Sequence, residues 1–293
     1  MTATVKLNRI LFVYALALLA AGQPALLSAQ QPTAMLLHPA SGTAPSFEVA
    51  TIKPNNDAGP GFRLQLSPTG LKATHASLRN LIAFAWSMKS DTQLIGAPAW
   101  SGSEFFDVQA KASEADVQSA KPMPMDAQMN NLRLKVQSLI AERFQLKARF
   151  ETRELPVYAL VVDKGGVKMK EVQPDPPPAP GTPLTPGAHG PQLRPTGPNQ
   201  ITATAWPIGE MTNWLSHLDE ISGRIVVDET GLTGHYDWVL DQIALSPAAA
   251  ANPDQPTVSI FKALPDQLGL KLEPRKAPLE VMVIDHVEEP SPN

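Results

Sequence analysis

The sequence predicts an α+β protein made of two tandem pseudo-repeats, each about β-α-β-α-β-β, with mainly antiparallel sheets backed by helices. Two observations predict this fold class. Alternating, β-branched runs typical of strands are interleaved with apolar residues spaced three and four apart, as in amphipathic helices. Short strings from the first half then recur in the same order, 122 to 130 residues later.

The first repeat, residues 46–168, opens with a strand at Phe47–Ile52 and a hairpin that turns at Ser67–Gly70. Ser77 is typical of a helix N-cap, and a strand at Phe105–Ala110 separates this first helix from a second one. The apolar stripes predict that the two helices bury, in turn, Leu78, Leu81, Ile82, Ala85 and Trp86, and then Met129, Leu132, Val136, Leu139 and Ile140.

The first repeat ends in two predicted strands, Phe144–Glu151 and Leu155–Asp163, with Arg153–Glu154 at the turn between them. Residues 169–199 contain a dense Pro/Gly cluster with few apolar side chains. Because such a segment buries too little surface to offset its ordering entropy, it favours a linker or a long surface loop.

The second repeat, residues 200–288, has the same order of elements. A helix begins at Pro207, and a later helix should break or kink at Pro265 because proline lacks a backbone N–H. The predicted strands are Ile201–Ala205, Ile225–Val227, Tyr236–Trp238, Leu270–Glu273 and Leu279–Asp285, and the second helix is Ile260–Leu268. The sequence leaves open whether the repeats are separate domains or share one sheet.

The N-terminus predicts export. Lys6 and Arg9 precede an apolar run, Ile10–Ala21, that is short for a membrane span, which indicates a signal peptide at 1–29. Cleavage near Ala29 or earlier, at Gly22, would release a periplasmic or extracellular protein, and an uncleaved N-terminal anchor is the alternative. Residues 30–45 should form a flexible leader and residues 289–293 a tail.

Charge and composition narrow the partners. The chain has no Cys, so disulfides, thiolate metal sites and a cysteine nucleophile are excluded. Loss of the signal peptide takes the net charge from −4 to −6, which argues against nucleic acid or an anionic membrane surface as the main partner. No metal-ligand spacing, phosphate-binding loop or cofactor motif occurs, so we expect no metal and no cofactor.

Four residues are the candidates for catalysis, as a hydrolase of unrecognised type: Asp107, Asp228, His235 and Asp237. Asp107 and Asp237 occupy matching places in the two repeats, however. Residues related in this way usually have equivalent structural roles, so turn or strand-end aspartates are the favoured interpretation.

Aromatic residues in loops are the candidates for ligand binding. Trp100 and Trp206 lie in or near predicted loops, where an exposed ring could stack on a sugar or a peptide. Packing in the core or under a lid is the favoured interpretation of these rings. Glu229 and His235 border the turn Gly231–Gly234, which favours a tight connection over an anion-binding nest.

Long strings in the chain resemble an uncharacterised family of secreted proteins that is expanded in Acidobacteria and other soil bacteria. The strings are FEVATIKP, LIAFAW, GAPAWSGSEFFDVQAKA, LIAERFQLKARFETRELPVYALVVDKGG, VVDETGLTGHYDW and LGLKLEPRKAPLEVMVIDHVEEPSPN. Related domains are attached in some proteins to BlaR-type membrane metallopeptidases, so the resemblance implies an extracytoplasmic sensing or interaction role. It implies no catalytic residues. Pro265 departs from the family pattern, in which the helix continues.

These observations predict an exported, non-enzymatic binding module whose ligand is a peptide, a glycan or an envelope protein. A hydrolase that uses the acids and the histidine near the 228–237 turn is the alternative, and an envelope-assembly module that docks to a sheet edge is a weaker one.

Overall fold

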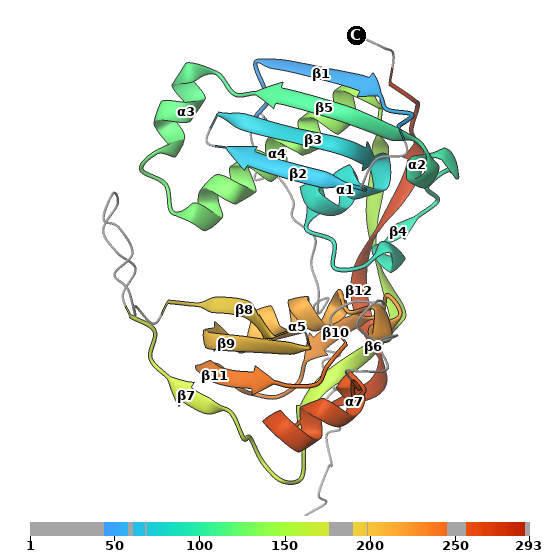
Figure 1. The fold of residues 1–293 in the computed structure, drawn as a ribbon. Coiled ribbons are helices and arrows are strands. Elements are labelled where there is room, and N and C mark those ends of the chain that lie inside the picture. Colours follow the sequence, from blue (N-terminus) through green and yellow to red (C-terminus); the bar gives the residue numbers. More distant parts are fainter. Residues whose placement is uncertain are drawn as a thin grey trace, which may run out of the picture. The chain divides into compact units, whose positions relative to one another are not determined.

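The computed structural model describes residues 44–57, 61–67, 69–175, 190–197, 199–244 and 256–290. These residues form three four-stranded sheets, mostly antiparallel, and six α-helices (Figure 1). The predicted α+β class is therefore confirmed. The predicted signal peptide and most of the leader lie outside the described residues, as does the end of the C-terminal tail.

The first sheet, sheet A, has the strand order β1-β5-β3-β2 and is antiparallel throughout. One core joins its buried face to helices α1 and α4, and Phe144, at the end of α4, lies fully buried in that core. The elements are β1 (Val49–Pro54), β2 (Arg63–Ser67), β3 (Gly70–Ser77), α1 (Leu78–Trp86), α2 (Trp100–Ser103), β5 (Phe105–Lys111), α3 (Glu114–Ala120) and α4 (Met125–Arg143).

The third sheet, sheet C, has the order β7-β11-β9-β8 and packs against α5, α7 and the π-helical turn η3 in a second core. Its elements are β7 (Lys170–Val172), β8 (Gln192–Gly197), β9 (Gln200–Pro207), α5 (Ile208–Ser216), β11 (His235–Leu240), α7 (Ile260–Ala263) and η3 (Leu264–Leu268). β7 and β8 fall inside the predicted linker 169–199, so its described ends are strands rather than linker.

The second sheet, sheet B, has the strand order β10-β6-β12-β4. Its long central strands, β6 (Lys147–Val162) and β12 (Leu270–His286), are antiparallel, and each pairs in parallel with a short edge strand, β10 (Ile225–Asp228) or β4 (Leu94–Ile95). Both predicted repeats thus contribute strands to one sheet, which answers the question that the sequence left open.

Two strand breaks that the sequence predicted in sheet B are absent. β6 continues through Arg153–Glu154, and β12 continues from Leu270 to His286 without the predicted break. The physical reason is that the two strands pair with each other over nearly their whole length, so each supplies the other's backbone partners. The polar residues taken for a turn are exposed residues within the ribbon.

The helix signals at Ser77 and Pro265 were read correctly, whereas two residues predicted to be buried on the second helix, Met129 and Leu132, are half-buried. Ser77 caps α1, and its hydroxyl accepts a hydrogen bond from the backbone N–H of Asn80. The α-helix that begins at Ile260 ends at Ala263, and the chain continues as π-helix with Pro265 in its first turn. The missing N–H of Pro265 is the physical reason for this change of helix type. All five predicted stripe residues of α1 are buried.

The two bulged strand pairs are held in the same way. The register shifts in β3/β5 and β9/β11, where His75 and Ala205 have φ of 53° and 47°. Asp107 Oδ1 accepts a hydrogen bond from the His75 backbone N–H at 3.0 Å, and Asp237 Oδ1 accepts one from the Ala205 N–H at 2.8 Å. Each carboxylate thus satisfies a backbone donor that the bulge removes from the ladder.

Replacing Asp107 or Asp237 with alanine is expected to lower the free energy of unfolding by about 1–3 kcal/mol each, because a backbone donor is left without its partner. Asparagine keeps the acceptor oxygen, so Asp237→Asn should cost less than Asp237→Ala. Urea unfolding of these three single variants measures this. Equal losses for the alanine and asparagine variants would contradict the assigned role.

Candidate functional site

The predicted catalytic residues lie in three different sheets. Asp107 belongs to β5, Asp228 ends β10, and His235 and Asp237 lie on β11. Asp228 Oδ1 accepts hydrogen bonds from Thr230 N at 2.9 Å and Thr230 Oγ1 at 2.7 Å, which is an Asx turn. Within the described parts of the chain, no hydrogen bond or ion pair joins any of these aspartates to His235.

The electrostatics of Asp107 fit a structural role. The amide of Asn55 donates to its Oδ1 at 2.8 Å, and this hydrogen bond, followed by the one from the His75 N–H, lowers the pKa of Asp107. A general acid near neutral pH needs the opposite shift. The arrangement favours a permanently charged carboxylate that organises the backbone.

The predicted ligand-binding residues are not gathered at one place either. Trp100 and Trp206 are half-buried, and they pack against two different hydrophobic cores. The indole N–H of Trp206 is buried without a hydrogen-bond partner. Glu229 is exposed and lies 3.6 Å from the Arg275 guanidinium. His235 is half-buried on β11, where its neighbours in register are Val172 and Pro207.

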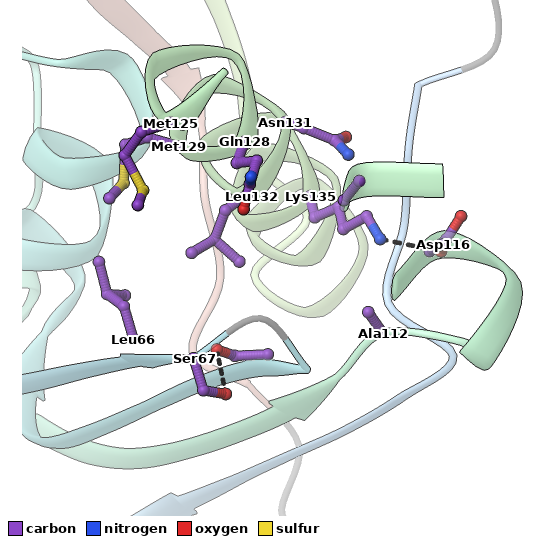
Figure 2. Close-up of a pocket in the computed structure, with 12 residues that line it drawn as sticks. Leu66, Ser67, Ala112, Asp116, Met125, Gln128, Met129, Asn131, Leu132 and Lys135 are labelled. Atoms are coloured by element: carbon purple, nitrogen blue, oxygen red, sulfur yellow. Dashed lines mark hydrogen bonds and ion pairs between the residues drawn. The ribbon is translucent and has the colours of Figure 1, made fainter. Parts of the chain in front are cut away.

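A pocket of about 260 Å³ lies elsewhere, between the β2–β3 hairpin and helices α3 and α4. Figure 2 shows Met125, Met129 and Leu132 of α4 on one side, with Leu66 and Ser67 of β2 on the other. The lining residues are Leu66, Ser67, Gly70, Ala112, Asp116, Ala120, Met125, Gln128, Met129, Asn131, Leu132 and Lys135.

The local sequence explains how the pocket walls are positioned. Ser113 caps α3 by accepting a hydrogen bond from the Asp116 N–H, and a turn from Ala120 to Met123 joins α3 to α4. Pro124 opens α4 without a side-chain cap. The helix then holds its C-terminal half in the core and leaves its first two turns beside the hairpin.

The pocket wall is apolar and open to solvent. Met125 is 75% exposed and Leu66 is 39% exposed, although both are large apolar side chains. Met129 and Leu132 are half-buried. Exposed apolar side chains that cluster around a concavity, rather than lying singly, mark a binding surface.

One ion pair lines the pocket. Lys135 Nζ lies 2.8 Å from Asp116 Oδ2, and the side chains are 5% and 42% exposed. The Lys135 ammonium also lies 6.0 Å from the centre of the Phe47 ring. The hydrogen bond from Lys135 is the main cause that lowers the pKa of Asp116. The two charges compensate each other, so the pocket offers no net charge to a ligand (Figure 2).

Asp116→Asn is expected to lower stability by about 1 kcal/mol at neutral pH, because a buried ammonium loses its anion while the exposed carboxylate is partly screened. The folded-state pKa of Asp116 is depressed, so its contribution is present above its unfolded pKa and is lost as pH falls through the folded value. The two proteins should therefore differ at pH 7 and converge towards pH 2 in urea unfolding. A difference independent of pH would contradict this.

Sequence reasoning missed this site. It placed Met129 and Leu132 on the buried face of a helix, and it placed Leu66 in a hairpin strand, so each signal was read separately. Their meeting depends on pairing that the local pattern does not encode. The two methionines at Met123 and Met125, in a Pro-containing link, were the available hint.

A family model described as a protein of unknown function, DUF3738, matches residues 79–287. The chain belongs to the DUF3738 family. The matched segment contains α3, α4 and all of sheets B and C, whereas β1, β2 and β3 precede it. No curated protein and no solved structure matches this DUF3738 chain.

The described residues lack two features. None of their helices is long and apolar enough to cross a membrane. They also contain no group of three or more His, Asp or Glu side chains placed to hold a metal ion.

Proposed function

We propose that this DUF3738 protein is a non-enzymatic binding module that takes an apolar group into the pocket between the β2–β3 hairpin and helices α3 and α4. One observation carries the proposal: Met125 is 75% exposed at the rim of a pocket of about 260 Å³ whose only charged pair is neutralised internally.

Energetics support a binding role for this wall. Each apolar side chain that a ligand removes from water contributes about 25 cal/mol per Å² of surface buried. Methionine side chains are flexible and polarisable, so they adapt to ligands of different shape. The exposed methionine and leucine side chains of the wall favour an apolar side chain of a peptide or an envelope protein over the hydroxyl-rich surface of a glycan.

Export from the cytoplasm is part of the same proposal. The protein is exported through its signal peptide, cleaved near Ala29, and meets its ligand in the periplasm or outside the cell. The resemblance to secreted soil-bacterial proteins, some attached to BlaR-type membrane metallopeptidases, fits an extracytoplasmic sensing or interaction role. Intact-mass measurement of the protein from the periplasmic or secreted fraction tests cleavage; a full-length protein there would overturn it.

A gene duplication is part of the proposed history. Support comes from matched elements in the two halves: a bulge held by Asp107 or Asp237, and a left-handed residue before each long strand, Gln145 and Gly269. The edge hairpins β2–β3 and β8–β9 also precede a helix of nine residues in each half.

The pocket is tested by an apolar probe, 1-anilinonaphthalene-8-sulfonate, titrated into the mature protein and followed by fluorescence. Leu132→Trp fills the pocket, and Met125→Glu removes apolar surface and places a negative charge at its rim, which repels the sulfonate of the probe. Both variants should therefore weaken probe binding by about tenfold or more, equivalent to about 1.4 kcal/mol.

Met123→Glu is the matched control, because Met123 is an exposed neighbour that does not line the pocket. It should bind the probe as the parent does. Unchanged binding in both pocket variants, with their folds intact by circular dichroism, would reject the site.

A further inference from the structure

We propose that the ligand is an extended peptide segment that adds to β2 as a fifth strand of sheet A and inserts an apolar side chain into the pocket. This inference rests on the proposed function and specifies its ligand. The segment alternates apolar residues, which face the pocket, with acidic residues, which face the opposite side of the sheet.

One edge of β2 has backbone groups that no other strand of sheet A pairs with. β2 is the last strand of sheet A and pairs only with β3. The hairpin closes with Ser67 opposite Gly70 across a two-residue turn, so Ser67, Gln65 and Arg63 direct their backbone groups towards β3. The N–H and C=O groups of Leu64 and Leu66 therefore point outward, where an added strand would meet them.

The pocket lies beside this edge of β2. Leu66 supplies both an outward-facing backbone and a side chain that lines the pocket. A strand added at the usual spacing of about 4.8 Å projects alternate side chains to the same face as Leu66. The side chain next to Leu66 would then lie against Met125 and Met129 of α4, which Figure 2 shows across from Leu66.

The outer edges of sheets A and C differ in the features that prevent strand addition. β8, the corresponding edge of sheet C, carries Pro195 at a register shift, and β7 has only three residues. β1 ends in Lys53–Pro54. Proline, lysine, bulges and short length are the usual devices that prevent strand addition. β2 has five residues and neither proline nor lysine, so among the outer edges of sheets A and C it is the one best able to accept a strand.

The exposed face of sheet A indicates the chemistry of the ligand's other face. The face of sheet A that points away from α1 and α4 carries four exposed cationic side chains. The carboxylate of Asp107 also lies on this face, but it already accepts hydrogen bonds from Asn55 and His75. The four cations are Lys53, Arg63, Lys72 and Lys111. Arg63 lies on β2 itself, so a neighbouring strand would meet it directly, and acidic side chains at that face are favoured.

The probe is a fluorescent nine-residue peptide of alternating leucine and glutamate, measured by fluorescence anisotropy with the mature protein. We expect saturable binding. A peptide with alternating lysine in place of glutamate should bind at least tenfold more weakly. Two further leucine/glutamate peptides are N-methylated at alternate residues, one at the leucines and the other at the glutamates. The peptide whose methyl groups replace the N–H groups that face Leu64 and Leu66 should lose binding.

Two protein variants complete the test. Leu66→Pro removes an outward N–H and leaves the pairing with β3, so it should abolish peptide binding. Arg63→Glu should weaken the acidic peptide at least tenfold and leave anilinonaphthalene sulfonate binding unchanged. Circular dichroism and thermal unfolding verify that both variants fold, and Arg63→Glu remains decisive if Leu66→Pro does not.

The outcomes separate the two proposals. If the apolar probe binds in the pocket but both N-methylated peptides bind like the parent peptide, strand addition is wrong and the proposed function stands. If the apolar probe is insensitive to the pocket variants, the proposed function and this inference both fail. Equal binding of acidic and basic peptides would refute the charge argument.

Discussion

Gly269→Ala is expected to lower the free energy of unfolding by about 3–5 kcal/mol, the sum of left-handed strain and a steric clash. Gly269 has φ of +68° at the junction of η3 and β12, and its carbonyl accepts a hydrogen bond from the Asp163 N–H. An added Cβ would stand 1.8 Å from the Gly166 carbonyl oxygen, which is backbone and has little freedom to move.

Gly231→Ala is the matched control for this substitution. Gly231 has φ of +70°, close to that of Gly269, but its Cβ would meet no atom within 4 Å. It should cost only the conformational strain, about 1–2 kcal/mol. Urea unfolding of both variants measures the difference. Equal losses would show that the close approach at Gly269 does not constrain the fold.

Phe144→Ala is the second large effect, with an expected loss of about 3–5 kcal/mol from the cavity that it leaves. Phe144 is 0% exposed, packs edge-on against Phe106 with ring centres 5.5 Å apart, and caps the end of α4. Its carbonyl also accepts the backbone N–H of Glu288 at 2.8 Å. The side chain thus anchors the helix that forms the pocket wall.

Phe62→Ala provides the comparison, because Phe62 is 40% exposed and should lose about 0.5 kcal/mol or less. Chemical denaturation of the two variants in parallel gives the difference. A loss below about 1 kcal/mol for Phe144→Ala would mean that the core around α4 collapses to fill the space, and the anchoring role would be wrong.

Local signals made much of the fold predictable. The Ser77 cap, the stripe of α1 and the proline at position 265 each act within a few residues, and each gave the right result. The continuous strands β6 and β12 were missed because their partners lie more than a hundred residues apart in the chain. Proline and charged residues inside β12 resemble a break when only the local sequence is considered.

The candidate site was less predictable for a related reason. Asp107, Asp237 and His235 attracted attention because catalytic chemistry uses these residue types, yet the two aspartates hold β-bulges and His235 lies on a strand. The pocket consists of ordinary leucine and methionine side chains. Only the tertiary pairing of the hairpin with α4 makes their exposure meaningful.

The most direct test of the binding site is an NMR titration of the protein, labelled with ¹³C at the methionine methyl groups, with the leucine/glutamate peptide. Substitution of individual methionines assigns the signals. We predict that the Met125 and Met129 methyl resonances shift saturably, while Met211, which is 1% exposed in the other core, stays in place. Bound peptide with unmoved Met125 and Met129 signals would contradict the account.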